Sequence, residues 1–174
     1  MEIRVLSPAQ QAVFDTEILN LLYLGEREFV PPLSARSSTT QSRFTNTSDS
    51  ADGVRLYFEE MKKQRLLVAT ENGALLGFVS FRENYISDVI QEQHLPNVYI
   101  STLLVSPAAR GRGLTKRMYE TLFTHFAERT ILTRTWSTNT AHIHILEGFG
   151  FETFHTIKND RGEGVDTVYF IKRA

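Results

Sequence analysis

The stretch VSPAARGRGLTKRMYE, residues 105–120, joins an apolar run to an amphipathic segment through one proline and two glycines. The run before it, residues 98–105, is mostly apolar and is typical of a buried strand. After it, apolar residues recur every fourth position, which predicts a helix with one buried face. These residues are Leu114, Met118, Leu122 and Phe126. The stretch is therefore predicted to be the turn between a strand and a helix.

This turn has the features of an anion-binding site. Backbone N–H groups in the first turn of a helix lack intrahelical acceptors, and the helix dipole is positive there. Gly111 and Gly113 leave room for a ligand to approach the main chain, while Arg110 and Arg112 add positive charge. We expect a phosphate or pyrophosphate site, the alternative being an ordinary solvated turn. The stretch is not a P-loop, because no Gly-Lys-Ser/Thr follows.

Periodicity elsewhere indicates strands and helices in mixed order. Strands are expected at 2–6, 65–70, 74–85, 98–105, 131–136, 151–158 and 165–172, and helices at 8–28, 54–64, 114–128 and 139–147, with a helical turn near 87–93. Asn72-Gly73 predicts a tight antiparallel hairpin. This order implies a mixed sheet with helices on both faces. The buried faces of the first two helices are expected to include Val13, Phe14, Ile18, Leu21, Leu22, Leu56, Tyr57, Phe58 and Met61.

Length and composition narrow the class of protein. The chain of 174 residues suffices for one domain, residues 1–174, with its own core. A net charge of -1 argues against a nucleic-acid binder, and the absence of cysteine excludes thiolate metal sites and thiol nucleophiles. No apolar run reaches the roughly 18 residues that a membrane helix needs. We expect a cytoplasmic protein that binds neither nucleic acid nor membrane.

The segment Arg110-Gly-Arg-Gly-Leu-Thr115 resembles the cofactor signature of the GNAT-type N-acetyltransferase family, Arg/Gln-x-x-Gly-x-Gly/Ala, with Thr115 in place of the final small residue. Asn139 and the later Gly150-Phe151 fit a second pattern of the family. The expected order of elements is also that of the family, so the resemblance extends from the first strand to the last. It implies an α/β fold with a mixed, mostly antiparallel twisted sheet of about seven strands, and acetyl-CoA as co-substrate.

The resemblance also implies roles for particular residues. The main chain of 110–115 would bind the pyrophosphate of acetyl-CoA, and the strand before it would pair with the pantetheine arm. Amides of Leu103 and Leu104 would polarise the thioester carbonyl during attack by an acceptor amine. The cofactor-binding residues expected in this way are Leu103, Leu104, Val105, Arg110, Gly111, Arg112, Gly113, Leu114, Thr115 and Asn139.

Two positions depart from the family's pattern. Ser101 and Thr102 stand where a carboxylate often serves as general base, and Leu146 stands where a tyrosine often protonates the leaving thiolate. Our hypothesis is that a water molecule held by Ser101, Thr102 or Tyr99 removes the proton. The expected function is acetylation of an amine on a small molecule or a protein, by a monomer or a homodimer. The alternative is a non-catalytic acyl-CoA-binding sensor or interaction module.

Other segments permit simpler interpretations. The Ser/Thr-rich segment 31–53 is either a flexible surface loop or a lid that shapes the acceptor site. Residues 160–164 are expected to form a solvated hairpin turn, and Trp136 a core or sheet-edge aromatic rather than a pocket wall. His142 and His144 lie two residues apart and would point to opposite sides of a helix, so no metal site is expected. His142 is interpreted as a partly buried, hydrogen-bonded residue rather than a general base.

Overall fold

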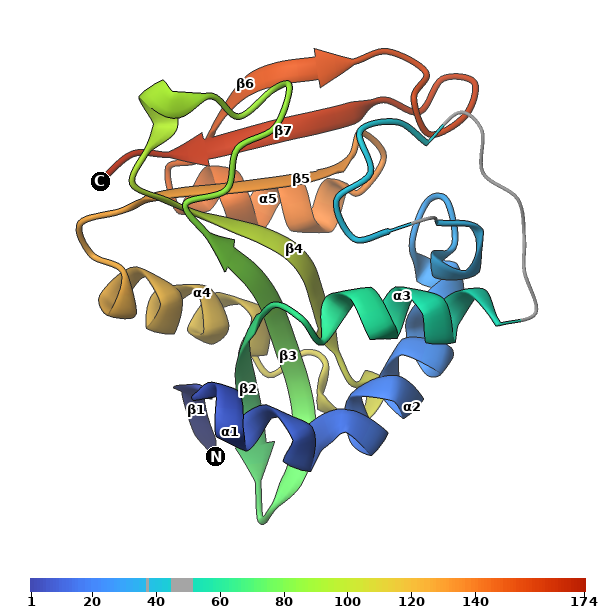
Figure 1. Cartoon of the computed structure of the whole chain (residues 1–174), viewed down its shortest axis with the longest axis vertical. Coiled ribbons are helices and arrows are strands. Elements are labelled where there is room, and N and C mark those ends of the chain that lie inside the picture. Colours follow the sequence, from blue (N-terminus) through green and yellow to red (C-terminus); the bar gives the residue numbers. More distant parts are fainter. Residues whose placement is uncertain (37, 45–51) are drawn as a thin grey trace.

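The structure is a computed structural model that describes residues 1–36, 38–44 and 52–174. In this part of the chain seven strands form one sheet in the order β1-β2-β3-β4-β5-β7-β6 (Figure 1). Neighbouring strands run antiparallel, except that β4 and β5 are parallel. The predicted mixed, mostly antiparallel sheet is confirmed. Its strands are β1 Glu2–Val5, β2 Arg65–Glu71, β3 Ala74–Glu83, β4 Asn97–Val105, β5 Thr130–Trp136, β6 Glu152–Ile157 and β7 Thr167–Lys172.

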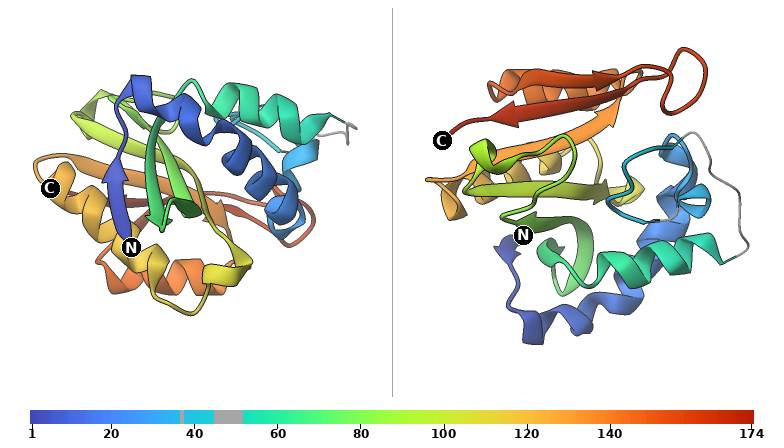
Figure 2. Two further views of the ribbon diagram at one scale, coloured as in Figure 1. Left: turned by 90° about the horizontal axis from the view of Figure 1, so that it is seen from below. Right: turned by 45° about the horizontal axis from the view of Figure 1, so that its top comes forward.

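Helices cover both faces of the sheet, as predicted (Figure 2). One face carries α1 Pro8–Gln11, α2 Asp15–Gly25 and α3 Gly53–Met61, and the other carries α4 Leu114–His125 and α5 Thr140–Gly148. Short 3-10 helices join these elements: η1 Ala12–Phe14, η2 Glu26–Glu28, η3 Leu33–Ala35, η4 Glu92–His94 and η5 Pro107–Ala109. None of the helices in the described residues has the length and apolar character needed to cross a membrane.

The first predicted helix is not continuous. Gln10 accepts a hydrogen bond from the Ser7 N–H at 3.0 Å, as a capping glutamine does, but η1 interrupts the α-helix directly afterwards. Because a 3-10 turn advances about 120° per residue rather than about 100°, side chains beyond it face new directions. Val13 is 76% exposed, so its predicted burial is wrong, while Phe14 is buried. Leu56 of α3 is likewise 58% exposed rather than buried.

The sheet divides the apolar core into two parts. The face under α4 buries the predicted stripe of that helix, including Met118 and Leu122, both 0% exposed. The opposite face buries Ile18 and Leu22 of α2 with Tyr57 and Phe58 of α3. These two cores hold the long strands in place on both sides, so the sheet provides a rigid frame for loops at its ends.

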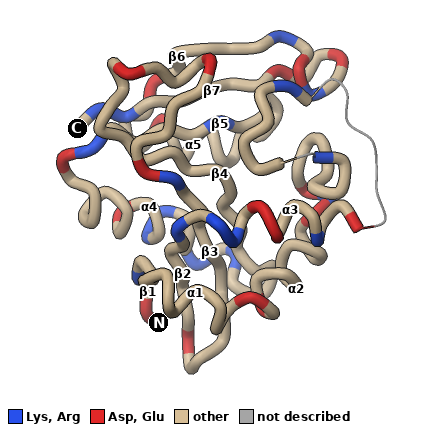
Figure 3. Tube along the Cα trace, in the orientation of Figure 1, with Lys and Arg blue, Asp and Glu red and all other residues tan. Residues whose placement is uncertain are grey.

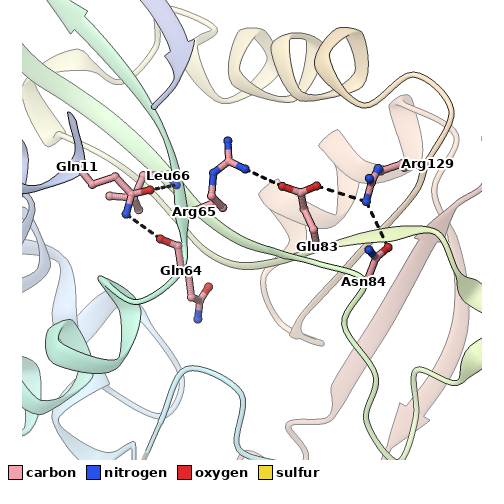
Figure 4. A network of polar contacts seen from close by, with 7 residues as sticks. All are labelled: Gln11, Gln64, Arg65, Leu66, Glu83, Asn84 and Arg129. Carbon is pink, nitrogen blue, oxygen red and sulfur yellow. Dashed lines mark hydrogen bonds and ion pairs between the residues drawn. The ribbon is translucent and has the colours of Figure 1, made fainter. Parts of the chain in front are cut away.

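Polar contacts fix the N-terminal segment to the sheet (Figure 4). The Gln11 side chain donates to the Gln64 carbonyl at 2.9 Å and accepts from the Leu66 N–H at 3.1 Å. At the hairpin that follows, Asn72 and Gly73 have φ values of 51° and 83°. Positive φ at both central residues is what a type I′ turn requires, so the predicted hairpin is confirmed.

The parallel pair β4 and β5 opens along its length. The two strands pair only from Asn97 to Ile100 and from Thr130 to Thr133. A register shift in the β3–β4 ladder leaves Ser101 unpaired between Ile100 and Thr102. Such a bulge bends the strand that contains it. Beyond Ser101, the edge of β4 that faces β5 has no strand partner among the described residues.

Candidate active site

A cavity of about 450 Å³ lies where β4 and β5 separate. Its β4 wall comprises Ile100–Val105, and its β5 wall comprises Thr133–Trp136. Further walls come from both faces of the sheet. The turn before α4 contributes Arg110, Gly111 and Gly113, and α5 contributes His142 and Ile145. The segment before α3 contributes Arg36 and Thr39, and the turn between β6 and β7 contributes Arg161. The opening between the strands therefore connects the α4 side of the sheet with the α3 side.

The turn before α4 presents free main-chain donors. Gly111 and Gly113 have φ values of 74° and 69°, and a side chain added at either would meet no atom within 4 Å. The N–H groups of residues 111–116 have no hydrogen-bond acceptor among the described residues, and the first bonded amide is that of Arg117, 3.2 Å from the Gly113 oxygen. Consecutive free amides at a helix N-terminus fit the oxygens of a diphosphate. The predicted anion site therefore has suitable geometry.

The two arginines of this turn point to different partners. Arg110 lines the cavity and donates from Nη2 to both carboxylate oxygens of Glu28 at 2.8 Å. Arg112 instead bonds the Glu71 carboxylate at 2.7 and 3.1 Å, and this contact lowers the pKa of Glu71. The structure thus brings the Arg110 side chain to the cavity but directs the Arg112 side chain away from it.

The free edge of β4 exposes alternate residues. The Ser106 N–H bonds the Leu76 oxygen of β3 at 2.8 Å. Because main-chain groups alternate in direction along a strand, Leu104 also faces β3, whereas Leu103 and Val105 face the opening. The contact of the Arg110 guanidinium with the Val105 oxygen, at 3.4 Å, agrees with this direction. Leu103, Leu104 and Val105 all line the cavity.

Ser101 and Thr102 line the cavity but already have hydrogen-bond partners. The Ser101 hydroxyl lies 2.5 Å from Gln64 Oε1 and 2.9 Å from the Ser80 hydroxyl. The Thr102 hydroxyl lies 2.6 Å from the Tyr57 hydroxyl. Within the part of the chain that the structure describes, neither hydroxyl bonds a carboxylate or an imidazole. Both hydroxyls can hold a water molecule, but neither is hydrogen-bonded to a basic side chain of the described residues.

Tyr99 does not line this cavity. Its ring stacks on Tyr85 at 4.7 Å between centroids, and it borders a second cavity of about 250 Å³. Burial raises the pKa of Tyr99, which disfavours its ionised form. The structure therefore brings together two of the three residues predicted to hold the proton-accepting water.

Helix α5 brings polar groups to the cavity at its N-terminus. Asn139 lies at the N-cap and donates to the Thr135 hydroxyl at 2.9 Å. His142 lines the cavity, with Nε2 at 2.9 Å from the Tyr119 hydroxyl. Burial lowers the pKa of His142 to about 4, so the ring is neutral at pH 7. Leu146 is 0% exposed and belongs to the core, so it cannot contact a bound thiol.

Among the cavity residues that the sequence analysis missed are three arginines, Arg36, Arg134 and Arg161. One signal was available for Arg134, which is the charged residue within the otherwise uncharged strand segment ILTRTW, 131–136. The other two lie in segments that look like solvated loops. Their position depends on contacts between distant parts of the chain.

The predicted solvated turn at 160–164 is wrong at its first two residues. Asp160 is 0% exposed and Arg161 is 7% exposed. Asp160 accepts hydrogen bonds from the Thr167 hydroxyl at 2.7 Å and from the Phe44 N–H at 3.3 Å. Arg161 donates to the Val30 oxygen at 2.7 Å. The segment before α3 packs over Asp160 and Arg161 through Phe44, whereas residues 162–164 are exposed as predicted.

That segment also forms part of the cavity wall. Arg36 and Thr39 line the cavity, whereas residues 37 and 45–51, on which the predicted lid also depended, lie outside the described residues. Trp136 lines the cavity as well, with its ring 6.0 Å from the ring of Phe29. Trp136 also packs against the core on the α2 side, so the core and pocket-wall interpretations both hold. Among the residues that the structure describes, no group of three His, Asp or Glu could hold a metal ion.

Comparison with known proteins identifies the family. The sequence model of the Acetyltransferase (GNAT) family matches residues 35–151. The chain belongs to the GNAT acetyltransferase family. The predicted resemblance is thus confirmed, although no curated protein sequence matches the chain significantly.

Solved structures of GNAT proteins share the fold. A ribosomal-protein-alanine N-acetyltransferase from Brucella melitensis is 18% identical with a TM-score of 0.66, over 100% of both chains. The structure of yncA from Salmonella typhimurium with acetyl-CoA is 19% identical with a TM-score of 0.60, over 99% of this GNAT chain and 93% of that one. An aminoglycoside 6'-N-acetyltransferase complexed with coenzyme A is 15% identical with a TM-score of 0.66, over 99% of this chain and 96% of that one.

Proposed function

We propose that this GNAT protein transfers the acetyl group of acetyl-CoA to an amine by direct attack. The observation that carries the proposal is the cavity between β4 and β5, which ends at the free main-chain donors of residues 111–116. Acetyl-CoA needs both features, a diphosphate site and a channel for its extended arm. The structures of relatives that hold acetyl-CoA or coenzyme A support this assignment.

The residues present fit this co-substrate. The amides of 111–116 would bind the diphosphate, and Arg110 would add a charge-assisted bond once it leaves Glu28. Main-chain groups of Leu103 and Val105 would pair with the pantetheine arm, because they face the opening. Asn139 would contact the same arm from α5. Arg112 would contribute its amide, since its side chain is paired with Glu71.

The reaction forms a C–N bond and breaks the C–S bond of the thioester. The Leu103 N–H would stabilise the oxyanion, because the Leu104 N–H is directed towards β3. An alkylamine with a pKa near 10.4 must first lose a proton, which costs about 4 to 5 kcal/mol at pH 7. We propose that a water held by Ser101 or Thr102 carries this proton to solvent. The coenzyme thiol has a pKa near 8.5, so its thiolate leaves without a tyrosine at position 146.

Turnover of acetyl-CoA tests the proposal. Purified protein is incubated with acetyl-CoA and a panel of primary amines, and free thiol and the mass of the acetylated amine are measured. Stoichiometric release of coenzyme A with an acetylated product is expected. Failure to bind acetyl-CoA would overturn the proposal.

A non-catalytic acyl-CoA sensor is the second candidate. It is favoured by the burial of Leu146 in the core and by the absence of a described carboxylate at the Ser101 and Thr102 hydroxyls. Tight binding of acetyl-CoA without acetylation of any amine would support it. We also propose that residues 1–174 act as one catalytic domain in the cytoplasm, a reducing compartment that suits a chain without cysteine.

A further inference from the structure

Three arginine side chains converge on one aromatic ring beside the cavity. The guanidinium carbons of Arg36, Arg134 and Arg161 lie 5.1, 4.8 and 4.2 Å from the centre of the Phe44 ring. They come from the segment before α3, from β5 and from the turn between β6 and β7. Figure 3 marks basic residues on β5 and on the loops to its right in blue. We call these three residues the arginine cluster.

The hydrogen bonds of the cluster go to neutral groups. Arg36 donates to the Pro31 oxygen at 3.1 Å, and Arg134 donates to the Gln41 oxygen at 2.6 Å and the Tyr169 hydroxyl at 2.9 Å. Arg161 donates to the Val30 oxygen and to the Thr167 hydroxyl. Main-chain and hydroxyl oxygens orient a guanidinium but do not neutralise its charge.

No carboxylate of the described residues forms an ion pair with the cluster. Across residues 1–36, 38–44 and 52–174, no Asp or Glu oxygen lies within 4.0 Å of the three guanidiniums. Asp160, next in sequence to Arg161, instead bonds the Thr167 hydroxyl and the Phe44 N–H. Arg65, Arg110 and Arg112, by contrast, each pair with a glutamate. Among the described residues, the cluster therefore has no direct ion pair, and only the nearby charge of Asp160 acts on Arg161.

One donor of the cluster has no partner. Nη2 of Arg36 is buried without a hydrogen-bond partner in the described structure. Burial lowers the pKa of Arg36 to about 10, and burial with repulsion from Arg36 and Arg134 lowers that of Arg161 to about 9. Both groups are still charged at pH 7. A buried charge without a counter-ion is costly, so an anion bound in the cavity would lower the electrostatic free energy of the cluster.

The cluster lies next to the opening between the strands. Arg134 directly follows Thr133, the last residue of β5 that pairs with β4, and is therefore level with Ser101. Tyr57, whose hydroxyl bonds Thr102, is near enough to raise the pKa of Arg36 and so partly oppose the effect of burial. An anion held by the cluster would thus sit close to the edge of β4 where the acetyl group is proposed to react.

We propose that the acceptor is a small primary amine that carries an anionic group, a carboxylate or a phosphate, bound by Arg36, Arg134 and Arg161. This inference rests on the proposed function. Guanidinium forks bind both kinds of anion through paired hydrogen bonds. The same charges repel polycationic amines, so this site does not suit acceptors such as aminoglycosides.

The cluster also favours the reactive form of the acceptor. After Asp160 and a monoanionic acceptor are counted, the three arginines leave an excess of positive charge. Nearby positive charge disfavours the ammonium form and lowers the pKa of the amine. A larger fraction of the acceptor then carries a free lone pair. The lower pKa of the amine reduces the free-energy cost of deprotonating it, and so replaces part of what a general base would do.

Matched pairs of amines test the proposal. Acetylation of L-methionine is compared with that of L-methioninamide, and acetylation of phosphoethanolamine with that of ethanolamine. We expect kcat/KM for at least one anionic member to exceed that of its neutral partner by 100-fold or more. The two pairs distinguish a carboxylate acceptor from a phosphate acceptor. Equal or better use of the neutral members would overturn the proposal.

Substitutions of Arg36 test whether the cluster causes the preference for anionic acceptors. Arg36→Met is expected to reduce the anionic-to-neutral ratio of kcat/KM at least 30-fold, and Arg36→Lys to restore part of it. The matched control is Arg65→Met, because Arg65 pairs with Glu83 in a network away from the cavity (Figure 4) and should keep the wild-type ratio. Thermal melts identify any variant that fails to fold. An unchanged ratio in folded Arg36→Met would exclude the cluster as the anion site.

A binding measurement separates this inference from the proposed function. Trp136 is the single tryptophan of the chain and lies 5.8 Å from the Arg161 guanidinium carbon. Its fluorescence should change on titration with N-acetyl-L-methionine and not with N-acetyl-L-methioninamide, even if no amine is acetylated. No response to either probe, or an equal response to both, would overturn the anion site. Anion binding without turnover would count against the proposed function alone.

Discussion

Gly113 holds the backbone in the left-handed region at the start of α4, with a φ of 69°. Gly113→Ala should cost about 1 to 2 kcal/mol of stability, because L side chains are strained there. The new Cβ meets no protein atom, so any further effect reports on the ligand. We expect the Kd for acetyl-CoA to rise at least tenfold, as measured by calorimetry.

Gly73→Ala provides the matched control for this prediction. Gly73 has a φ of 83° and equally open surroundings, but it lies in the β2–β3 hairpin. Its replacement should lower stability by a similar amount and leave acetyl-CoA affinity unchanged. Equal affinities for the two variants would show that the amides before α4 do not bind the cofactor.

His142 is expected to make stability depend on pH. Its folded pKa of about 4 lies below the unfolded value of about 6.5. Above pH 6.5 the ring is neutral in both the folded and the unfolded state, and its contribution to the free energy of unfolding is fully present. Between pH 6.5 and 4 the unfolded state binds a proton that the folded state does not, so the free energy of unfolding falls. The loss should reach about 2 kcal/mol at pH 5. Urea unfolding at pH 7.5 and pH 5 measures it.

Urea unfolding of two variants at the same two pH values tests whether His142 causes this loss of stability. His142→Gln keeps a polar partner for Tyr119 but cannot titrate, so it should lose about 2 kcal/mol less than wild type between the two pH values. His144→Gln, on the exposed side of the same helix, should behave as wild type. A wild-type pH dependence in His142→Gln would refute the assignment.

At the scale of elements, α3 packs against η3 through a glycine. A Cβ on Gly53 would lie 2.1 Å from the Ser34 oxygen and 2.6 Å from its Cα, so the two elements would have to move apart. Gly53→Ala should therefore lower the free energy of unfolding by about 3 kcal/mol, measured by urea denaturation. It should also weaken use of the acceptor, because Arg36 directly follows η3.

Gly148→Ala is the control at the other side of the sheet. Gly148 ends α5 and has no atom within 4 Å of an added Cβ. Alanine there should be neutral or stabilise by up to about 1 kcal/mol, because it has the better helix propensity. A similar loss in both variants would mean that the close packing of α3 on η3 is not the cause.

For the whole molecule, the cofactor should stabilise the fold. Acetyl-CoA at a hundred times its Kd should add about 2.7 kcal/mol to the free energy of unfolding. For a chain of this size that corresponds to a rise in Tm of roughly 5 to 10 °C. S-acetylpantetheine, which lacks the diphosphate, should give a much smaller shift at the same concentration. Equal shifts would contradict binding through the amides of residues 111–116.

The sequence predicted elements whose signals are local. The hairpin at Asn72-Gly73 and the buried stripe of α4 depend on residues a few positions apart, and both are confirmed. Val13 and Leu56 were predicted wrongly because periodicity alone does not show where a helix tightens or which side of it meets the sheet. The direction of the Arg112 side chain was missed for a similar reason, since Glu71 approaches from another hairpin.

By itself, the sequence determined the turn that is proposed to bind acetyl-CoA, because its glycines, arginines and flanking strand and helix are contiguous. The acceptor side of the cavity was decided only by the tertiary structure. Arg36, Arg134 and Arg161 come from three separate segments. Phe44 contacts all three only when the sheet has formed and the loop before α3 packs on the β6–β7 turn. Uncompensated charge depends on distances between such segments, and no local pattern of residues encodes those distances.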